Sequence, residues 1–464
     1  MCEAFHIKKL NPIVDLLVIH KSHPERYPFL LESVANGDEN CRYSILFAFP
    51  QSSIRLNQLN DLELKNIELE SKQFISGLNE WFEREQKQVP IGLKEKLPFY
   101  GGWFVYLGYE LAEEIEPVLN LPQQSDIMLP VAMATRIPAA IIVDKLKNES
   151  WLISEPSFEN LIIEMDNDIQ AVTNKNAKTK VLFQQKRITE EKPSRYIQAV
   201  KRIKEYIIDG DVFQVNISRK WKIDLDRKVN SSTVYAQLCK SNPAPFAGLM
   251  LEGSCAVVSS SPERLVSVKN GIVQTRPIAG TRPRCRNKRG NIDQKADDEL
   301  REELINHPKE RAEHVMLIDL ERNDLGRVSK PGSVVVDELM VLESYEHVHH
   351  IVSNVKGELI AGTLPGDVIS AVFPGGTITG CPKVRCMQII GELEGSARQA
   401  YTGSMGYVNI DGDMDLNILI RTIIHSGNQL HIRAGAGIVA YSDPEKELQE
   451  TRIKAKGMLD LVMV

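Results

Sequence analysis

The spacing of apolar residues along the chain predicts helices and strands in alternation. From residue 194 to 209 the apolar positions recur at intervals of four, three and four residues, as on one face of a helix, and Gly210 ends the pattern. Ser194 is suited to cap this helix. Its apolar face consists of Tyr196, Val200, Ile203 and Ile207. Further helices are predicted at 308–321, 382–393 and 444–462.

Short apolar runs rich in β-branched residues predict the strands. They occupy 43–49, 139–144, 213–218, 255–261 and 332–342. Together with the helices they indicate an α/β (α+β) chain with much antiparallel sheet. The sequence has no internal repeat and neither of the glycine-rich nucleotide loops, GxGxxG and GxxxxGK[ST].

The chain divides into three parts by composition. Residues 1–150 mix apolar runs with turn signals, whereas 155–190 are polar and aperiodic, which predicts a connection on the surface. We therefore expect an N-terminal domain at 1–150, a connection at 151–190 and a second domain at 191–464.

Composition excludes several classes of protein. The 464 residues carry a formal net charge of −6, which argues against nucleic-acid binding by bulk attraction to phosphate. The longest apolar run, 129–143, is interrupted by Arg136 and Pro138, so no membrane span is expected. His6 and Lys8 stand where a signal peptide would be apolar, which favours a cytoplasmic protein. The seven cysteines form no CxxC pair, which argues against disulfide frameworks and zinc sites.

Two predicted helices each carry a pair of glutamates on one face. Glu310 and Glu313 are three residues apart, and so are Glu447 and Glu450. Like charges at this spacing are unfavourable unless water or a cation separates them. Carboxylates without accompanying histidine or cysteine suit a hard cation, Mg²⁺ before Ca²⁺. The alternative is that both pairs are solvated helix faces.

Two glycine-rich segments indicate a site for a small polyanion. Residues 374–382 (PGGTITGCP) lead into a helix expected to begin at Pro382, and 434–437 (AGAG) form a second segment. Glycines let the backbone approach a ligand closely, and a helix N-terminus attracts anions. Arg421 and Lys454 would neutralise such a ligand. Ordinary turns are the alternative for either segment.

Eight ordered motifs between about 190 and 460 resemble the chorismate-utilising family, which includes anthranilate synthase component I, aminodeoxychorismate synthase component I, and the isochorismate and salicylate synthases. The motifs are SPERL, RPIAGTRPR, KERAEHVMLIDLERNDLGR, HHIVSNV, FPGGTITGCPKVRCM, YTGSMGY, IRT and GAGIVAYSDPEKELQET. The fold implied by this resemblance is a sandwich of two antiparallel β-sheets flanked by helices, and the implied substrate is chorismate.

The resemblance also implies roles for the matching residues. Taken alone, His350 is more typical of a structural histidine and Glu263 is uninformative. By resemblance, Thr377 and His350 flank the ring of chorismate, and Glu263 is the buried, protonated acid that assists loss of the C4 hydroxyl. The Mg²⁺ positions are Glu310, Glu313, Glu447 and Glu450. Of these, Glu313 and Glu450 are the direct ligands. The substrate-binding positions are Ala279, Gly280, Thr281, Tyr401, Arg421, Gly435, Gly437 and Lys454.

The identity of the nucleophile is inferred from the residue at position 214. Gln214 falls where the water-adding members of the family carry a lysine base, and a glutamine cannot deprotonate water. The resemblance therefore implies ammonia as the nucleophile. Class I glutaminases contain a cysteine within Gly-x-Cys-x-Gly, and none of the seven cysteines has that setting. We expect a separate glutaminase subunit to supply ammonia.

Two amination products are consistent with the sequence. Asn216 and the segment 242–246 (NPAPF) resemble aminodeoxychorismate synthases, which favours 4-amino-4-deoxychorismate, the precursor of 4-aminobenzoate in folate biosynthesis. Ala279 favours the alternative, because well-known members of that group carry a lysine there that attacks C2. The alternative product is anthranilate, formed with pyruvate for tryptophan biosynthesis. A regulatory protein that binds chorismate without turnover is the non-enzyme alternative.

The N-terminal part resembles the tryptophan pocket of these enzymes. The resemblance lies in LLES at 30–33 and RYS at 42–44. It implies an amino-acid pocket, and does not by itself imply inhibition; a buried strand with a polar edge is the alternative. The expected pocket residues are Glu32, Ser33, Tyr43, Ser44, Pro243 and Phe246.

Overall fold

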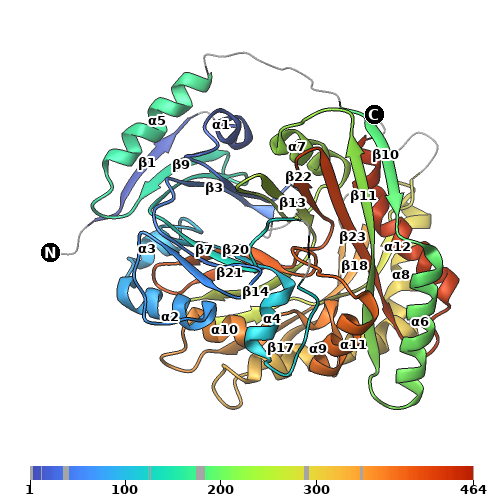
Figure 1. Ribbon diagram of the computed structural model, residues 1–464. Helices are drawn as coiled ribbons and strands as arrows, with labels where there is room; N and C mark the ends of the chain where they lie inside the picture. Colours follow the sequence, from blue (N-terminus) through green and yellow to red (C-terminus); the bar gives the residue numbers. More distant parts are fainter. Residues whose placement is uncertain are drawn as a thin grey trace.

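The computed structural model describes residues 4–11, 13–34, 41–123, 125, 127–173, 183–286, 292–344 and 348–462. The strands form two large antiparallel sheets, with helices on the outside (Figure 1). This arrangement confirms the predicted sandwich.

The first sheet has twelve strands among the described residues. In spatial order they are β1 (His6–Leu10), β9 (Glu149–Ser154), β8 (Ala139–Asp144), β3 (Tyr43–Ala48), β2 (Phe29–Glu32), β12 (Phe246–Glu252), β13 (Cys255–Ser261), β22 (Thr422–Ser426), β23 (Gln429–Ile438), β11 (Gln214–Leu225) and β10 (Gln185–Glu190), with β19 (Gly380–Cys381) paired to β11.

The second sheet has eleven strands within the same described ranges. In spatial order they are β16 (Ile278–Pro283), β18 (Val348–Glu358), β15 (Ile272–Thr275), β14 (Arg264–Lys269), β21 (Met414–Asn417), β20 (Ser404–Asn409), β6 (Gly102–Leu107), β7 (Ala132–Ile137), β4 (Ser53–Leu56) and β5 (Leu62–Lys65), with β17 (Val335–Ser344) paired to β18.

Helices cover the outer faces of both sheets (Figure 1). The α-helices are α1 (Leu16–Ser22), α2 (Phe74–Glu85), α3 (Ile91–Lys94), α4 (Ala112–Ile115), α5 (Asn160–Thr173), α6 (Pro193–Ile208), α7 (Ser231–Ser241), α8 (Gln294–Asn306), α9 (Pro308–Gly326), α10 (Pro365–Val372), α11 (Lys383–Glu394) and α12 (Pro444–Leu459). Short 3₁₀ turns are η2 (Tyr109–Leu111), η3 (Gly376–Ile378) and η4 (Asp460–Val462).

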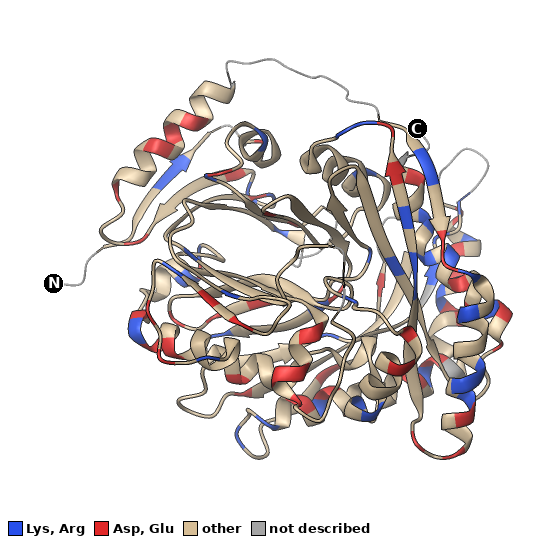
Figure 2. Cartoon of the chain, viewed as in Figure 1, with Lys and Arg blue, Asp and Glu red and all other residues tan. Residues whose placement is uncertain are grey.

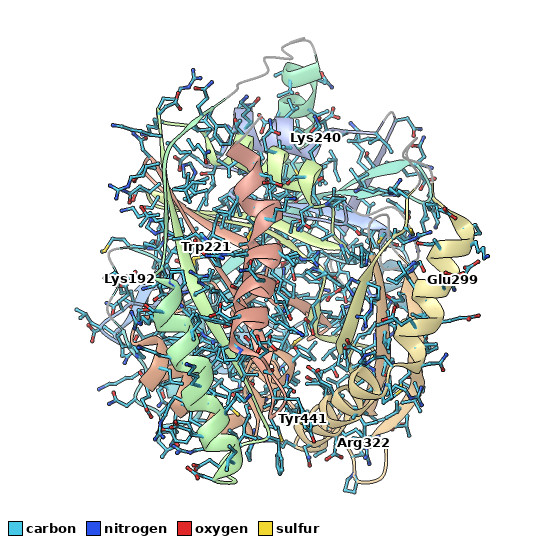
Figure 3. All side chains as sticks on the ribbon, turned by 90° about the vertical axis from the view of Figure 1, so that its right-hand side faces the viewer. Lys192, Trp221, Lys240, Glu299, Arg322 and Tyr441 are labelled. Carbon is cyan, nitrogen blue, oxygen red and sulfur yellow. The ribbon has the colours of Figure 1, made fainter. Side chains whose placement is uncertain are left out.

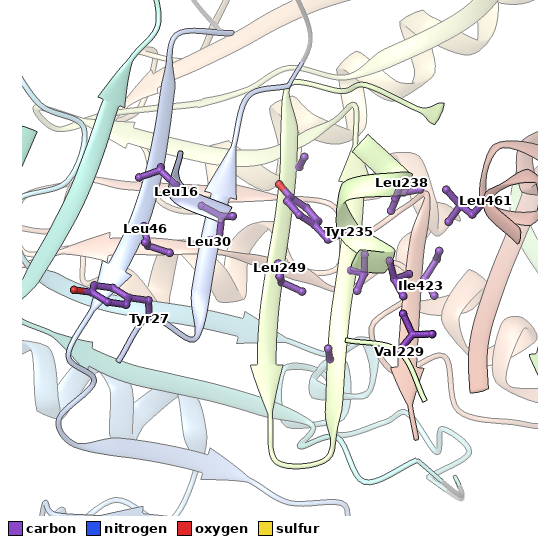
Figure 4. Packing of buried hydrophobic residues seen from close by; sticks show 14 of the residues in the cluster. Leu16, Tyr27, Leu30, Leu46, Val229, Tyr235, Leu238, Leu249, Ile423 and Leu461 are labelled. Carbon is purple, nitrogen blue, oxygen red and sulfur yellow. The ribbon is translucent and has the colours of Figure 1, made fainter. Parts of the chain in front are cut away.

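The two faces of the first sheet bury different cores. On β2, Phe29 points inward and stacks on Phe104 of β6, with ring centroids 4.1 Å apart, which joins the two sheets. Its neighbour Leu30 points outward, because successive side chains of a strand alternate. There it belongs to the core that includes Leu16 of α1 and Tyr235 of α7 (Figure 4).

Both parts of the chain contribute to both sheets. β2 pairs with β12, so that Leu30 lies opposite Leu249, and β6 pairs with β20, so that Val105 lies opposite Gly406. The boundaries expected near 150 and 190 are therefore not boundaries of the sheets. The segment expected to be an irregular connection contains α5 and β10, while 174–182 lie outside the described residues.

Most predicted helices and strands are confirmed, with corrections at their ends. α6 begins at Pro193, so Ser194 lies in its first turn and is not the cap; proline suits that first position because its missing N–H has no helical partner there. Pro382 precedes α11 and does not begin it. Asp443 caps α12 as expected, accepting hydrogen bonds from the backbone of Glu445 and Lys446.

Charged residues of both signs lie mainly on the outer elements of the fold. Figure 2 shows lysine, arginine, aspartate and glutamate interspersed mainly over the helices, while the strands between them are largely uncharged. Within the described part of the chain, none of the helices combines the length and the apolar character that a membrane span requires.

A buried ion cluster joins α11 to β11 and β23. The carboxylate of Glu394 accepts hydrogen bonds from the Ser218 amide at 2.8 Å, from Arg398 at 2.6 Å and from Arg433 at 2.9 Å. Burial acts to raise the pKa of Glu394, but attraction to the two guanidinium groups and the hydrogen bonds together leave that pKa below its ordinary value. The cluster is therefore ionised and fully paired at neutral pH.

Removal of this carboxylate is expected to destabilise the protein strongly. Glu394→Ala leaves two buried guanidinium groups without their counter-charge, which should lower the free energy of unfolding by about 3–5 kcal/mol. Urea unfolding measures the difference. Glu205→Ala removes an exposed partner of Arg202 and serves as the control, with an expected change of less than about 1 kcal/mol. Equal effects of the two variants would contradict this account.

Candidate active site

Many of the residues predicted to form the site come from elements that pack against one another. β11 and β23 are neighbours in the first sheet, with α12 packed on β23, while α9 packs against β16 and β18 of the second sheet. Figure 3 shows this side, with α12 in the centre, α6 to one side of it and α8 and α9 to the other.

Glycines of β23 make room for two amide side chains of β11. Asn216 lies opposite Gly437 in the antiparallel pair. A Cβ atom at Gly437 would collide with Nε2 of Gln214, and one at Gly435 would lie 2.9 Å from Oδ1 of Asn216. Side chains larger than hydrogen are thus excluded at both glycines. The glycines and the amides together form a cradle, which we call the glycine cradle.

Two of the predicted substrate-binding residues border the glycine cradle. A Cβ at Gly435 would lie 2.8 Å from Oη of Tyr401. Lys454 of α12 donates a hydrogen bond to the backbone oxygen of Gly435 at 3.2 Å. A hydroxyl and an ammonium group therefore stand beside a backbone that has no side chains of its own.

The buried acid Glu263 lies between β13 and β14, and the residue is 6% exposed. Burial raises the pKa of Glu263 to about 7, against the lowering effects of the Thr377 hydroxyl, the Ile278 backbone, and the charges of Lys454 and Arg421. Oε1 of Glu263 has no hydrogen-bond partner within the strict distance and angle limits among the described residues. A carboxyl that is half protonated near neutral pH can act as a general acid.

Arg421 lies close to this acid, and His350 lies close to Arg421. His350, on β18 opposite Thr281, is buried, and its burial together with the charge of Arg421 lowers its pKa to about 4. The imidazole is therefore uncharged at neutral pH. Arg421 has a φ of 50° and donates to Oδ1 of Asn242 at 3.4 Å. Burial lowers the pKa of Arg421, and Glu263 opposes that effect.

β16 borders the site from the second sheet. Ala279 is 5% exposed, and Gly280 has a φ of +72°, which favours glycine. A Cβ at Gly280 would lie 3.0 Å from Oε2 of Glu310. The predicted substrate-binding segment thus lies beside Glu310, the first of the four predicted Mg²⁺ positions.

The four predicted metal-binding glutamates surround the site without forming a ready-made cage. Glu310 pairs with Arg282 at 3.3 Å, Glu313 accepts from Gln214 at 3.1 Å, and Glu450 pairs with Lys454 at 2.8 Å. Glu447 is buried, with 7% of its side chain exposed. No three metal-ligating side chains meet closely enough to hold an ion in the described ranges. The set is made of carboxylates alone and so fits a hard cation that exchanges with these partners.

A family comparison agrees with this geometry. The model of the family described as chorismate binding enzymes matches residues 28–460. The chain belongs to the family of chorismate binding enzymes.

Relatives of this chain are named after two different synthases. A Bacillus subtilis protein named aminodeoxychorismate synthase component 1 is 40% identical over 396 residues, which are 83% of this chain and 81% of that protein. An Acetivibrio thermocellus protein named anthranilate synthase component 1 is 36% identical over 459 residues, 94% and 90% of the two chains. A Synechocystis protein named anthranilate synthase component I-like is 42% identical over 375 residues, 80% and 74%.

Solved structures of the family share the fold. Anthranilate synthase component I from Streptococcus pneumoniae superposes with a TM-score of 0.79 at 30% identity, covering 91% of this chain and 93% of that one. The isochorismate synthase MenF of Escherichia coli has a TM-score of 0.73 at 18% identity, covering 99% and 95%.

Two further acids of this chorismate binding enzyme were missed in the sequence. Glu321 of α9 is buried, and burial, then the neighbouring Asp324, raises its pKa to about 8. A Cβ at Gly376 would lie 3.4 Å from Oε1 of Glu321, so this acid lies beneath the loop that carries Thr377. Asp324 is paired with Lys383. Glu321 and Asp324 are three residues apart, as are the predicted Mg²⁺-binding glutamates. This spacing was the signal in the sequence that could have identified them.

Four of the six residues expected to form an amino-acid pocket line a cavity between the sheets. Its volume is about 300 Å³, and Glu32, Ser33, Tyr43 and Phe246 line it. Ser44 does not, because it follows Tyr43 on β3 and points to the opposite face. Pro243 is not part of the lining either; Pro245 takes that place.

The raised pKa of Glu263 predicts a pH-dependent stability. In the unfolded chain this carboxyl ionises near its ordinary pKa of 4.5, whereas in the folded chain it does so at about 7. Between these values the unfolded chain binds fewer protons, so this carboxyl's contribution to folding falls as pH rises. Glu263→Gln should therefore gain stability relative to the natural protein between pH 4.5 and 7, by up to about 3 kcal/mol.

Urea unfolding at pH 5, 6, 7 and 8 tests this expectation. The difference between Glu263→Gln and the natural protein should grow with pH and then level off above pH 7. A difference that does not depend on pH would show that Glu263 ionises normally in the folded protein.

Proposed function

We propose that this chorismate binding enzyme catalyses the Mg²⁺-dependent amination of chorismate with ammonia to 4-amino-4-deoxychorismate, the precursor of 4-aminobenzoate. The observation that carries the proposal is the amide of Gln214 in the glycine cradle, where the neighbouring Lys454 also acts electrostatically on the buried acid Glu263. An amide has no basic group for activating water, whereas ammonia is a nucleophile without activation.

Substrate binding is assigned to the residues around the glycine cradle. Arg421, Lys454 and Tyr401 supply cationic and hydroxyl donors for the carboxylates of chorismate, and Gly435 and Gly437 let the substrate approach the backbone. When bound, Mg²⁺ would neutralise and orient the ring carboxylate. The residues that would hold it are Glu310, Glu313, Glu447 and Glu450.

Glu263 supplies the proton for the leaving group. Hydroxide leaves poorly, so the C4–O bond breaks with transfer of the Glu263 proton to the departing oxygen, which leaves as water. The hydroxyl of Thr377 lies beside the acid, and together with the neutral ring of His350 it would hold the ring of the substrate without adding charge. The bond from C4 to nitrogen replaces the bond to oxygen, and the added nitrogen releases one proton.

A second product is favoured by one residue. Ala279 offers no amine that could attack C2, which supports direct attack of ammonia at C2 and formation of anthranilate with loss of pyruvate. Against this, Asn216 and the segment 242–246 are features of the aminodeoxychorismate group, and the Bacillus subtilis relative carries that name. We therefore place C4 amination first.

The supply of ammonia is assigned to a separate glutaminase subunit. The sequence lacks the Gly-x-Cys-x-Gly element of class I glutaminases, and the similar proteins are named as component 1 or component I. The cavity between the sheets is assigned to an amino acid, with tryptophan as the candidate, because it combines the carboxylate of Glu32 with the rings of Tyr43 and Phe246.

The metal assignment predicts the effect of two substitutions. Glu313→Ala and Glu450→Ala should each reduce turnover of chorismate at least 100-fold and weaken Mg²⁺ binding, because each removes a ligand carboxylate. Initial rates and titration calorimetry with Mg²⁺ measure the two effects. Glu445→Ala, an exposed acid in the first turn of the same helix as Glu450, is the control and should leave both unchanged. Near-normal turnover in either ligand variant would refute the assignment.

A product assay decides between the two aminations. The pure protein is incubated with chorismate, Mg²⁺ and ammonium at alkaline pH, where more ammonia is unprotonated, and the products are separated by chromatography. The expected product is 4-amino-4-deoxychorismate, which becomes 4-aminobenzoate only after a separate lyase is added. Direct appearance of anthranilate without a lyase would show attack at C2 and refute the first choice.

A further inference from the structure

We propose that the side-chain oxygens of Gln214 and Asn216 form the binding site for ammonia in the glycine cradle. This inference rests on the proposed function, because it concerns an enzyme that uses ammonia.

Gln214 presents one buried acceptor. Its Nε2 donates to Oε1 of Glu313 at 3.1 Å, which leaves the amide oxygen at the other end of the group. The side chain is 3% exposed, and within the described residues Oε1 has no donor. A buried acceptor left without a donor costs about 1–3 kcal/mol.

Asn216 presents a second acceptor on the same face of β11. Two residues along a strand return to the same side, so the amides of Gln214 and Asn216 both face the glycines of β23. Oδ1 of Asn216 is buried, lies 2.9 Å from the place of a Cβ at Gly435, and likewise meets no donor in the described ranges. The backbone oxygen of the same residue is held by Arg398 at 2.8 Å, so the acceptor cannot turn away with the strand.

The ligand that suits two unpaired acceptors is a small hydrogen-bond donor. Carboxylates of chorismate have no hydrogens to donate, so they do not satisfy these oxygens. Ammonia brings three N–H donors and is small enough for a buried site beside glycine. Its lone pair accepts no hydrogen bond in this arrangement and is free to form the new C–N bond. Water and the hydroxyl of chorismate are the competing donors.

A kinetic experiment on Asn216→Leu tests the proposal. Leucine matches asparagine in shape and lacks the acceptor. Initial rates are measured against ammonium chloride at saturating chorismate and Mg²⁺ and at one alkaline pH. The KM for ammonium should rise about fivefold or more, which corresponds to the loss of one net hydrogen bond. The KM for chorismate should stay within about twofold.

Two further variants make the result specific. Asn216→Asp keeps an acceptor oxygen and should keep the KM for ammonium within about twofold of the natural protein. Ser154→Ala removes a buried, unpartnered hydroxyl of β9 and should change neither KM. If Asn216→Leu does not fold, Asn216→Ser, whose hydroxyl is too short to replace the amide oxygen, carries the same prediction.

Two outcomes would overturn the proposal. An unchanged KM for ammonium in Asn216→Leu would assign the acceptors to water, and an equal rise in the KM for chorismate would assign them to the substrate hydroxyl. A natural protein that forms no ammonium-dependent product would refute the proposed function, and the inference with it.

Discussion

The site depends on one buried ion pair, between Arg398 and Glu394. Glu394 fixes the end of α11 against β11 and β23 through Ser218 and Arg433. Arg398 then reaches from the same carboxylate to the backbone oxygens of Asn216 and Ile378, at 2.8 and 3.4 Å. These two carbonyls belong to the strand that carries Gln214 and to the turn that carries Thr377. The guanidinium group of Arg398 therefore sets the position of the glycine cradle relative to the turn that carries Thr377.

The protein treats its buried carboxylates in two ways. Glu394 faces two guanidinium groups and is ionised. Removal of either partner would leave a buried charge without its counter-charge, which destabilises the fold. Glu263 and Glu321 lie where burial dominates, and the pKa of each is raised to about 7 and about 8. The same low-polarity surroundings that make the ion pair structural thus keep a proton on the acids near Thr377. The proposed acid catalysis therefore depends on a buried carboxyl whose charge is not fully neutralised by its neighbours.

Local signals in the sequence could predict helices and strands, but not which distant residues come together in the site. The helix at 444–462, its cap Asp443 and the glutamate pairs follow from spacing within one helix. The motifs identified the family and, through it, the sandwich. The contact between Gln214 and Glu313 joins residues nearly a hundred positions apart, and no spacing rule contains it. Helix α5 was missed because its apolar face is short and lies next to a polar stretch, and Glu321 was missed because a glutamate in a charged segment looks solvated.

The central claim is that chorismate binds in the glycine cradle with its C4 hydroxyl at Glu263. A crystal structure of the Glu263→Gln variant with chorismate and Mg²⁺ tests it most directly, because the variant keeps the shape of the site and removes the acid. The account predicts the ring between Thr377 and His350, the C4 oxygen within hydrogen-bond distance of the side chain at position 263, and the carboxylates at Arg421 and Lys454. Chorismate bound elsewhere, such as in the cavity between the sheets, or with C4 turned away from position 263, would contradict it.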